Sequence, residues 1–396
     1  MAGPVEGING AEGNALFGNA GEYFLIGNDP NPVREASSID FKDGFNSATN
    51  LATDVYATTQ LAELSQTIPI ANLTIAQTTR TLSGFAGGLQ ESNAGSAFPV
   101  IFQSVDSPSA VNLEFNASRN TLLADFNLLD VNNRDFVNSY TFGFGSDAAS
   151  PNGGQSAFID DDRYGAQHDR TATRVAFDDS TVATYPNSVG QNNPNTYFFG
   201  NELVPTTGFV PGGVNICACK FLEWGYWGGL LRYQDPQASP GQARKDYFHL
   251  ATWVAGTPTA NLPPTGFATF SGHVIGNVAQ TVNGQVQQFV AAGSYQQTWD
   301  FGTRTGAAQI TNFAGRSFGS TNLTAPFTPG NFSGPVNGAL TGQIAGAFVS
   351  DGAVDVAGVI GKFRAEDASD RTLFTAQGII AAETTSFTGS GPQASN

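Results

Sequence analysis

The chain has 396 residues, of which 40% are hydrophobic and only 13% charged, and its formal net charge at pH 7 is −16. Cores can form from this composition, but a nucleic-acid-binding surface is excluded, because phosphate contacts require clustered Lys and Arg. The 47 glycines and 20 prolines predict many turns and few long helices, with a low-charge polar surface typical of extracellular β-proteins.

The N-terminal part carries little pattern. Residues 1–50 are rich in Gly and Asn, and the opening M-A-G-P-V-E-G-I-N-G lacks the charged and apolar regions of a secretory signal. Either the protein is not exported by that route, or Met1 begins a mature or truncated chain. We expect the second, because the composition of the rest of the chain is typical of extracellular proteins. No run of eighteen apolar residues occurs, so no transmembrane helix is predicted. Apolar residues between Leu51 and Leu64 predict one amphipathic helix, with imperfect spacing.

Strand patterns begin after residue 79. In V-N-L-E-F-N, residues 111–116, apolar side chains alternate with polar ones, which predicts a half-buried antiparallel strand. Residues 138–144 predict another strand. Residues 145–215 are loop-like, and a loop of this length is often functional. We place a domain boundary between residues 201 and 215, which divides the chain into a Gly/Asn-rich segment (1–50), a strand-rich domain with long loops (51–214) and a C-terminal domain (215–396).

After Cys219, strand-like runs alternate regularly with turn residues. Eight strands are predicted, at residues 221–233, 245–256, 266–278, 286–301, 306–318, 336–349, 354–365 and 371–382. Asn283-Gly284 favours a tight hairpin between two of them. Eight consecutive antiparallel strands predict an up-and-down barrel, whose interior is filled by side chains or holds one small ligand. Glycines within the strands suit bent or crowded positions. An open sandwich is the alternative.

Several runs in this region resemble a known module. They are G-F-A-T-F-S-G-H-V-I-G-N-V, F-V-A-A-G-S-Y-Q-Q-T-W-D-F-G-T-R-T-G-A-A-Q-I, G-A-L-T-G-Q-I-A-G-A-F-V and A-G-V-I-G-K-F. Together they resemble the C-terminal barrel of the transferrin-binding-protein-B-like family, which also ends large proteobacterial proteins with a FecR domain. The C-x-C and W-G-x-W motifs are similar to the start of that module in the FecR-associated proteins. The resemblance covers residues 215–385 and, more weakly, a strand-rich handle-like domain at 80–145.

The resemblance implies a surface-exposed or secreted bacterial protein that binds host iron proteins, haem or other partners. This chain departs from the family in having no lipobox cysteine and only one recognisable unit of handle and barrel. The fold expected is therefore mostly β, with a strand-rich N-terminal domain and an eight-stranded antiparallel barrel. Partner-binding loops vary within the family and are not carried over.

The two cysteines, Cys217 and Cys219, lie in N-I-C-A-C-K. They suit a disulfide, which is strained at this spacing, or two buried free thiols. With His249 and His273, on neighbouring predicted strands, they would also make a four-ligand zinc site. The sequence leaves the three alternatives open.

The run W-G-Y-W, residues 224–227, places large aromatic side chains on both sides of one strand. We interpret it as a strand packed on both faces, between the barrel interior and the N-terminal domain, with an aromatic ligand platform as the alternative. A haem ligand would have to come from Tyr226, Tyr247, His249 or His273, and such lone residues are usually packing groups.

Acidic loops raise a calcium hypothesis. Asp130, Asn132 and Asp135 form one group, and Asp160, Asp161 and Asp162 form another. Closely spaced oxygen ligands suit a hard cation, but neither group matches a complete EF-hand loop. Solvated turns are the alternative. No cofactor is firmly implied by the residues; calcium stays open as a hypothesis and haem is not expected.

Motifs of catalysis are missing from the sequence: it has no G-x-S-x-G, phosphate-binding loop, H-E-x-x-H or dinucleotide fingerprint. We therefore expect a non-enzymatic binding protein at the bacterial surface or secreted, which presents loops to a protein or small ligand. The alternative is a structural subunit of a surface layer, filament or appendage. A protein partner or self-association is expected in either case.

Overall fold

The computed structural model of the chain describes most residues from Thr79 to Gly389. These are residues 79–92, 98–118, 121–131, 137–145, 155–160, 163–167, 172–177, 181–186, 197–201, 214, 217, 219, 221–234, 243–259, 261–325 and 330–389. The Gly/Asn-rich segment and the predicted helix at residues 51–64 lie outside the described residues.

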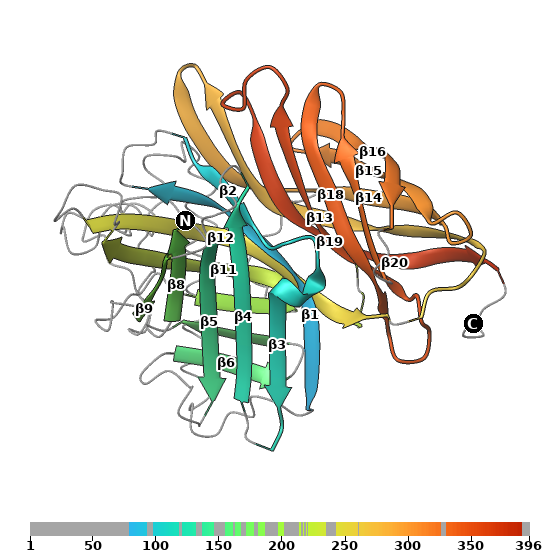
Figure 1. Cartoon of the computed structure of the whole chain (residues 1–396), viewed down its shortest axis with the longest axis horizontal. Coiled ribbons are helices and arrows are strands. Elements are labelled where there is room, and N and C mark those ends of the chain that lie inside the picture. The colour runs from blue at the N-terminus through green and yellow to red at the C-terminus, as the bar shows by residue number, and fades with distance from the viewer. Residues whose placement is uncertain are drawn as a thin grey trace.

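The described part of the chain is almost entirely β-strand, arranged as a first sheet and a barrel that lie side by side (Figure 1). The first sheet contains β1 (Arg80–Ser92), β2 (Val100–Gln103), β3 (Val111–Asn116), β4 (Thr121–Asp130), β5 (Val137–Gly145), β6 (Gln155–Asp160), β7 (Arg163–Gln167), β8 (Ala172–Phe177), β9 (Thr181–Pro186), β10 (Tyr197–Asn201), β11 (Leu222–Gln234) and β12 (Ala243–Pro258). The barrel contains β13 (Phe267–Val282), β14 (Gln285–Asp300), β15 (Thr305–Phe313), β16 (Arg316–Thr324), β17 (Asn331–Val336), β18 (Leu340–Ser350), β19 (Gly358–Asp367) and β20 (Thr375–Thr388). Within these residues, no helix has the length and hydropathy needed to span a membrane.

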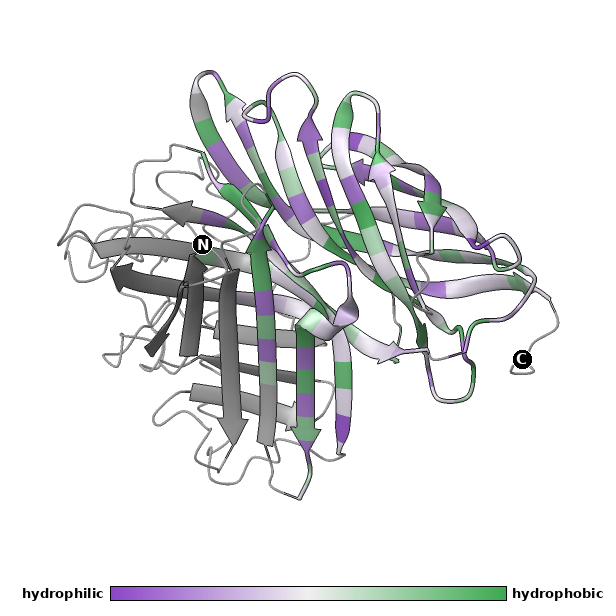
Figure 2. Ribbon diagram, viewed as in Figure 1, coloured by the Kyte–Doolittle hydropathy of each residue, from purple (hydrophilic) through white to green (hydrophobic). Residues whose placement is uncertain are grey.

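The first sheet is antiparallel, in the order β9-β8-β5-β4-β3-β1-β12-β11-β10-β7-β6. The predicted strand at 111–116 is confirmed as β3, with Val111, Leu113 and Phe115 buried and the polar residues between them half-buried. Figure 2 shows the same alternation as bands of hydrophobic and hydrophilic colour along β3.

The region predicted as loop, 145–215, contains five short strands, β6 to β10, so that prediction was wrong. Each of these strands has only five or six residues and has Gly, Asn or Asp close to its ends. Such short runs do not show a clear alternation of apolar and polar side chains.

The first sheet is strongly curved around its own core. Phe126 on β4 lies 5.6 Å from Trp227 on β11, between ring centroids, although β3, β1 and β12 separate these strands in the hydrogen-bonded order. Trp227 faces this core, whereas Trp224 on the same strand contacts His273 of the barrel. The W-G-Y-W strand is thus packed on both faces, but its second face meets the outer wall of the barrel and not its interior.

Among the described residues, eight antiparallel strands close into an up-and-down barrel. Each strand from β13 to β20 pairs with the next, and β20 pairs with β13 over most of its length, from Phe267↔Thr388 to Ala279↔Thr375. Closure leaves no unpaired edge in this sheet, which is the physical reason for the arrangement. The predicted fold class is confirmed.

The strands that form the barrel differ from those predicted. The runs predicted at 221–233 and 245–256 are β11 and β12, which pair in the first sheet, and only Thr257 and Pro258 of β12 also pair with β18. The single strand predicted at 306–318 is a hairpin, β15 and β16, that turns at Ala314-Gly315 with both residues at positive φ. An unpredicted strand, β17, completes the count of eight.

The barrel interior is filled by side chains. At one end, Phe348 contacts four aromatic rings with centroids 5.2–5.7 Å away: Phe270, Trp299, Phe301 and Phe332. At the other end, Phe363 packs on Phe313 and Phe318. Between them the Tyr295 hydroxyl donates to Gln297 Oε1 at 2.6 Å, and burial raises the pKa of Tyr295 above its usual value. Of the two predicted interiors, the filled one is therefore observed.

Polar contacts join the first sheet to the barrel. The segment after β2 lies against β18 and β19, where Lys362 Nζ is 2.8 Å from Asp106 Oδ1 and also donates to the Ser104 carbonyl. Gln103 Nε2 donates to the Phe363 carbonyl at 2.7 Å, and Gln343 Nε2 donates to Asp106 Oδ2 at 2.8 Å. Because the Lys362 side chain is 8% exposed, its charge depends on these partners.

Replacing Asp106 by alanine is expected to lower the free energy of unfolding by about 1–2 kcal/mol. The nearly buried Lys362 ammonium would lose its acid partner, but Asp106 is 42% exposed, so solvent limits the loss. Urea denaturation measures the difference. Lys362→Met removes the charge itself and should cost less, and an equal or larger loss in that variant would contradict this explanation.

Candidate functional site

The first sheet covers only half of the barrel wall that it faces. On β13, residues 273–279 are buried, whereas Phe267 and Thr269 at the other end of the strand reach solvent. β20 shows the same division, with residues 375–382 buried and most residues from Glu383 to Thr388 exposed. One end of the outer wall is therefore open, and the candidate site lies there.

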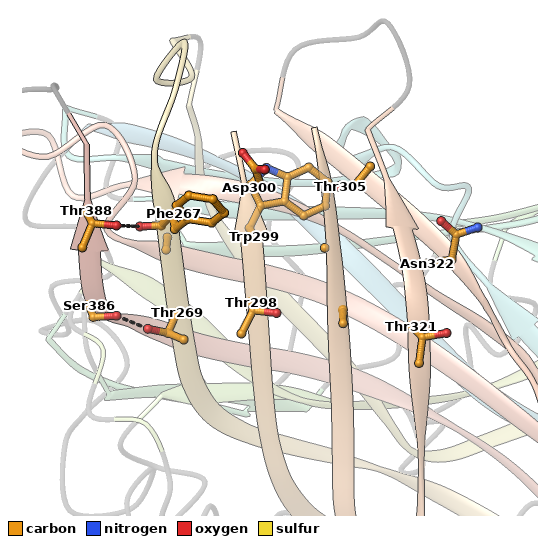
Figure 3. Close-up of a pocket in the computed structure, with 13 residues that line it drawn as sticks. Phe267, Thr269, Thr298, Trp299, Asp300, Thr305, Thr321, Asn322, Ser386 and Thr388 are labelled. Carbon is orange, nitrogen blue, oxygen red and sulfur yellow. Dashed lines mark hydrogen bonds between the residues drawn. The ribbon is translucent and has the colours of Figure 1, made fainter. Parts of the chain in front are cut away.

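A groove of about 560 Å³ crosses this open wall over β20, β13, β14, β15 and β16 (Figure 3). Residues with hydroxyl side chains are the most frequent type that lines the groove: Thr269, Thr298, Thr305, Thr321, Ser386 and Thr388. Strand register sets part of them in a row, because Ser386 lies opposite Thr269, and Thr269 opposite Thr298. Neighbouring members of such a row are separated by the strand spacing, about 4.8 Å.

Aromatic and acidic groups lie among these hydroxyls. Phe267 is 61% exposed, the largest exposure among the big apolar side chains of the described residues. Trp299 also lines the groove, and its indole N–H is buried without a hydrogen-bond partner in the part of the chain that the structure describes. Asp300 Oδ1 accepts from the backbone N–H groups of Gly302 at 2.9 Å and Thr303 at 3.3 Å, which fixes the carboxylate at the margin of the groove.

The groove was not predicted from the sequence. A weak signal exists: outward positions of β13, β14 and β20 carry Thr or Ser where a solvated strand commonly carries charged residues. That signal becomes a site only when the register brings together residues 267–269, 298–300 and 386–388, and the sequence does not show which strands are neighbours.

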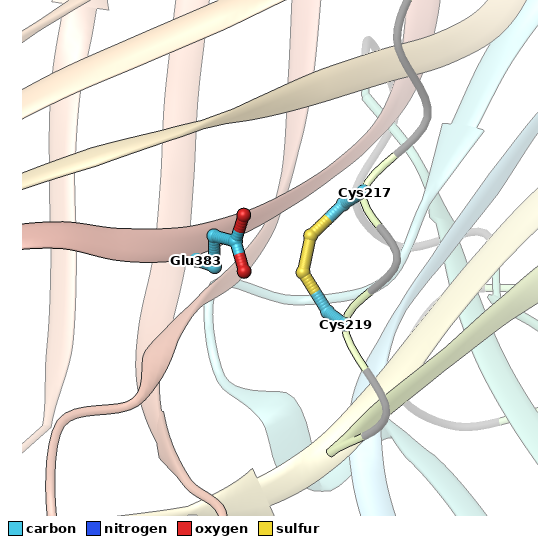
Figure 4. Close-up of side chains that lie close together, drawn as sticks. All are labelled: Cys217, Cys219 and Glu383. Atoms are coloured by element: carbon cyan, nitrogen blue, oxygen red, sulfur yellow. A yellow bond between two sulfur atoms is a disulfide. The ribbon is translucent and has the colours of Figure 1, made fainter. Parts of the chain in front are cut away.

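The two cysteines lie at the border between the covered and the open wall. In the structure the sulfurs of Cys217 and Cys219 are joined in a disulfide, beside Glu383 of β20 (Figure 4). The Cys sulfurs and a Glu383 carboxylate oxygen lie within 4.8 Å of one another. Joined sulfurs offer no thiolate to a metal, so the zinc alternative would require reduction of the disulfide first.

Of the two histidines predicted as ligands, His273 is the one whose side-chain surroundings are described. Its Nδ1 accepts from the Cys217 backbone N–H at 2.9 Å, and its ring lies 5.0 Å from Trp224, between centroids. Burial lowers the pKa of His273 to about 3. The ring is therefore a neutral packing group in the joint between the sheets. Tyr226 is fully buried as well, and nothing is described of the side chains of Tyr247 and His249.

Stability is expected to decrease between pH 6.5 and about pH 3 because of His273. In this window the unfolded chain binds a proton at His273 and the folded chain does not, so acid favours unfolding by about 1.4 kcal/mol for each pH unit below 6.5. Urea denaturation from pH 7 to 4.5 measures the slope. In His273→Gln the slope should be smaller by that amount, and an unchanged slope would show that other groups cause the acid sensitivity.

The calcium hypothesis falls mostly on residues that are not described. Asp130 ends β4 and Asp160 ends β6, whereas Asn132, Asp135, Asp161 and Asp162 lie outside the described residues. The two groups stay a prediction. A rise in melting temperature on adding calcium, reversed by chelator, would support it.

No protein-family model matches this chain, and no curated protein matches it in sequence. Among solved structures, it is similar to transferrin binding protein B from Haemophilus parasuis (12% identity, 77% of this chain and 76% of that one, TM-score 0.29). It is also similar to HpuA from Kingella denitrificans, solved in complex with human haemoglobin (12% identity, 83% and 96% covered, TM-score 0.30). A surface lipoprotein matches 42% of this chain (13% identity, 77% of that chain, TM-score 0.28). Scores this low do not establish a relationship.

Proposed function

We propose that this chain is a non-enzymatic bacterial binding protein, exposed at the cell surface or secreted, that recognises its ligand with the outer wall of the barrel. The observation that supports this most is the contrast between the two sides of that wall. Packed rings fill the interior, including Phe348 and Phe363, whereas an open groove lies outside. An eight-stranded barrel filled in this way has its binding surface on its exterior and its loops.

The charge and composition support an extracellular setting. The net charge of −16 favours solubility and disfavours anionic partners, and the outer surface uses Thr, Ser, Asn and Gln in place of charged residues. The disulfide between Cys217 and Cys219 suits an oxidising compartment. The FecR association implied by the sequence resemblance stays a prediction.

A variant whose groove is filled by a large side chain tests the proposal. Wild-type protein and Thr298→Trp, in which an indole fills the groove from an exposed strand position, are each immobilised and exposed to fluid from the native environment. Thr311→Trp is the matched control, because Thr311 is an exposed threonine on β15 outside the groove lining. A ligand retained by wild type and Thr311→Trp but lost by Thr298→Trp supports the proposal. Equal retention by all three would place binding elsewhere.

The structural alternative predicts a different result. A subunit of a surface layer or filament would form polymers, which size-exclusion chromatography and electron microscopy would detect at concentrations where a binding protein stays small. Polymers that persist in Thr298→Trp, without retention of any ligand, would replace the proposed function with the structural one.

A further inference from the structure

We propose that the groove binds a neutral saccharide chain, lying across the strands from β20 to β16. This inference rests on the proposed function and names the ligand class for the same site. It follows from four properties of the lining: its charge, its hydrogen-bonding groups, its exposed aromatic ring and its position on the face of a closed sheet.

The charge of the lining disfavours anionic ligands. Asp300 is the one ionisable side chain among the described residues that line the groove, and Lys, Arg and His do not occur among them. A phosphate, a carboxylate or a sulfated sugar would meet a carboxylate without a compensating cation, in a protein whose net charge is already −16. The ligand is therefore neutral at the part that enters the groove.

The hydrogen-bonding groups match a polyol. A Ser or Thr hydroxyl both donates and accepts, as each sugar hydroxyl does, so Thr298 and Thr321 can pair with a sugar in either direction. The other lining hydroxyls already hold one hydrogen bond within the protein, Thr269 with Ser386, Thr305 with Thr303 and Thr388 with the Phe267 carbonyl, and each keeps accepting capacity for a ligand. Asn322 adds an amide that donates and accepts, and Asp300 adds an ionised acceptor, which forms stronger hydrogen bonds than a neutral one. Since Asp300 Oδ1 is held by Gly302 and Thr303, its other oxygen has no hydrogen-bond partner among the described residues.

Phe267 provides the apolar part of the surface. An exposed phenyl ring among hydroxyls gains nothing from water, but its electron-rich face attracts the C–H groups on the flat side of a pyranose ring. A mostly polar lining with one such ring is what a sugar requires, whereas a drug-like apolar ligand would need a mainly hydrophobic pocket.

The position on the sheet excludes an extended peptide as the preferred occupant. Peptides that bind to sheets add a strand to a free edge and use its backbone groups. The three central strands under the groove, β13, β14 and β15, are paired on both sides, so their backbone groups are already bonded and cannot take up a further strand. The two outer strands are paired on one side for most of the groove, because β20 pairs with β19 only up to Glu383 and β16 pairs with β17 only at Thr324. Five strands span about 19 Å at the usual spacing, which suits an oligosaccharide better than a single sugar.

A glycan array probed with the full chain tests the inference, with titration calorimetry on the neutral oligosaccharide that binds best. Wild type should bind neutral glycans and not sulfated or sialylated ones. Phe267→Ala and Asp300→Asn should each weaken binding about tenfold or more, and Thr298→Trp should abolish it. Asn at position 300 still accepts from Gly302 and Thr303, so the turn is kept. Thr311→Trp should bind as wild type does.

Each other outcome contradicts the inference in a distinguishable way. Binding of anionic glycans only, or of neutral glycans equally by wild type and Thr298→Trp, overturns it. If the array is negative while a ligand from the native environment is lost in Thr298→Trp, the saccharide inference fails and the proposed function stands. If the array is negative and the native fluid yields no ligand, both fail.

Discussion

Replacing Phe348 by alanine is expected to lower the free energy of unfolding by about 3–5 kcal/mol. Phe348 lies at the centre of the barrel's aromatic cluster, fully buried and in contact with Phe270, Trp299, Phe301 and Phe332. Phe270, Trp299 and Phe332 belong to barrel strands, and the Phe301 N–H donates to the Gly266 carbonyl at 2.9 Å, so the backbone restrains these rings from collapsing into the space left behind. Chemical denaturation followed by tryptophan fluorescence measures the loss.

Phe267→Ala is the matched control for this prediction. It makes the same substitution on the same barrel, but at a side chain that is 61% exposed, so the expected change is within about 0.5 kcal/mol. A similar loss in both variants would mean that the cluster around Phe348 is not packed as described. Circular dichroism would show whether Phe348→Ala still forms the barrel.

Replacing Gly276 by alanine is expected to cost about 3 kcal/mol or more, and the loss should appear at the closure of the barrel. Gly276 on β13 pairs with Gly378 on β20, and a Cβ at position 276 would lie 1.9 Å from the Gln377 carbonyl oxygen and 2.5 Å from the Gly378 Cα. Backbone atoms cannot move aside as a side chain can. The strands would therefore separate locally, and hydrogen exchange of the β13–β20 amides measures this together with the free energy of unfolding.

Gly302→Ala serves as the comparison, because Gly302 lies in an exposed turn. A Cβ there would meet only Asp300 Oδ1, at 3.3 Å, which belongs to a side chain that can adjust. Its stability should stay close to that of wild type. Unchanged protection of the β13–β20 amides in Gly276→Ala would contradict the close approach of the two strands.

Some features of the fold could be predicted from short stretches of the sequence. The Asn283-Gly284 turn was predicted from two residues, and both adopt positive φ, 53° and 79°, as a tight hairpin turn requires. β3 was predicted from strict alternation. Gly378 was predicted to lie at a crowded position, and a Cβ there would lie 2.6 Å from the Phe363 ring. The turn and β3 depend on residues that are close in sequence. The crowding at Gly378 comes from Ile275 and Phe363, which are distant in sequence, and its signal in the sequence is the Gly itself within a strand-like run.

Other elements depend on partners that local sequence does not name. The β15–β16 turn uses Ala314, at φ 51°, where a turn signal would be Asn or Gly, so one strand was predicted in place of two. β17 contains Gly334 and Pro335, which are typical of loops. β11 and β12 have the length and composition of barrel strands, but they pair with β10 and β1 in the first sheet.

The candidate site was not predicted either, because it also depends on which strands are neighbours. Its residues come from five strands. Which strands are neighbours, and which residues on them lie opposite one another, cannot be read from the sequence. Charged clusters and cysteines stand out in this sequence because charged residues make up only 13% of it and cysteines number two. Threonines on solvent-facing strand positions are common, and only their assembly into one concave surface beside Phe267 and Asp300 distinguishes them.

From Thr375 to Glu383, the last strand of the barrel is bonded along both of its sides, to β13 and to β19. Tension applied beyond Thr388 first loads the ladder with β13 and then, from Glu383 inward, is shared by two antiparallel ladders whose hydrogen bonds are loaded together along the strand direction. Such a strand does not peel away one bond at a time. It resists until many bonds yield at once, which makes the barrel mechanically strong toward force applied along β20.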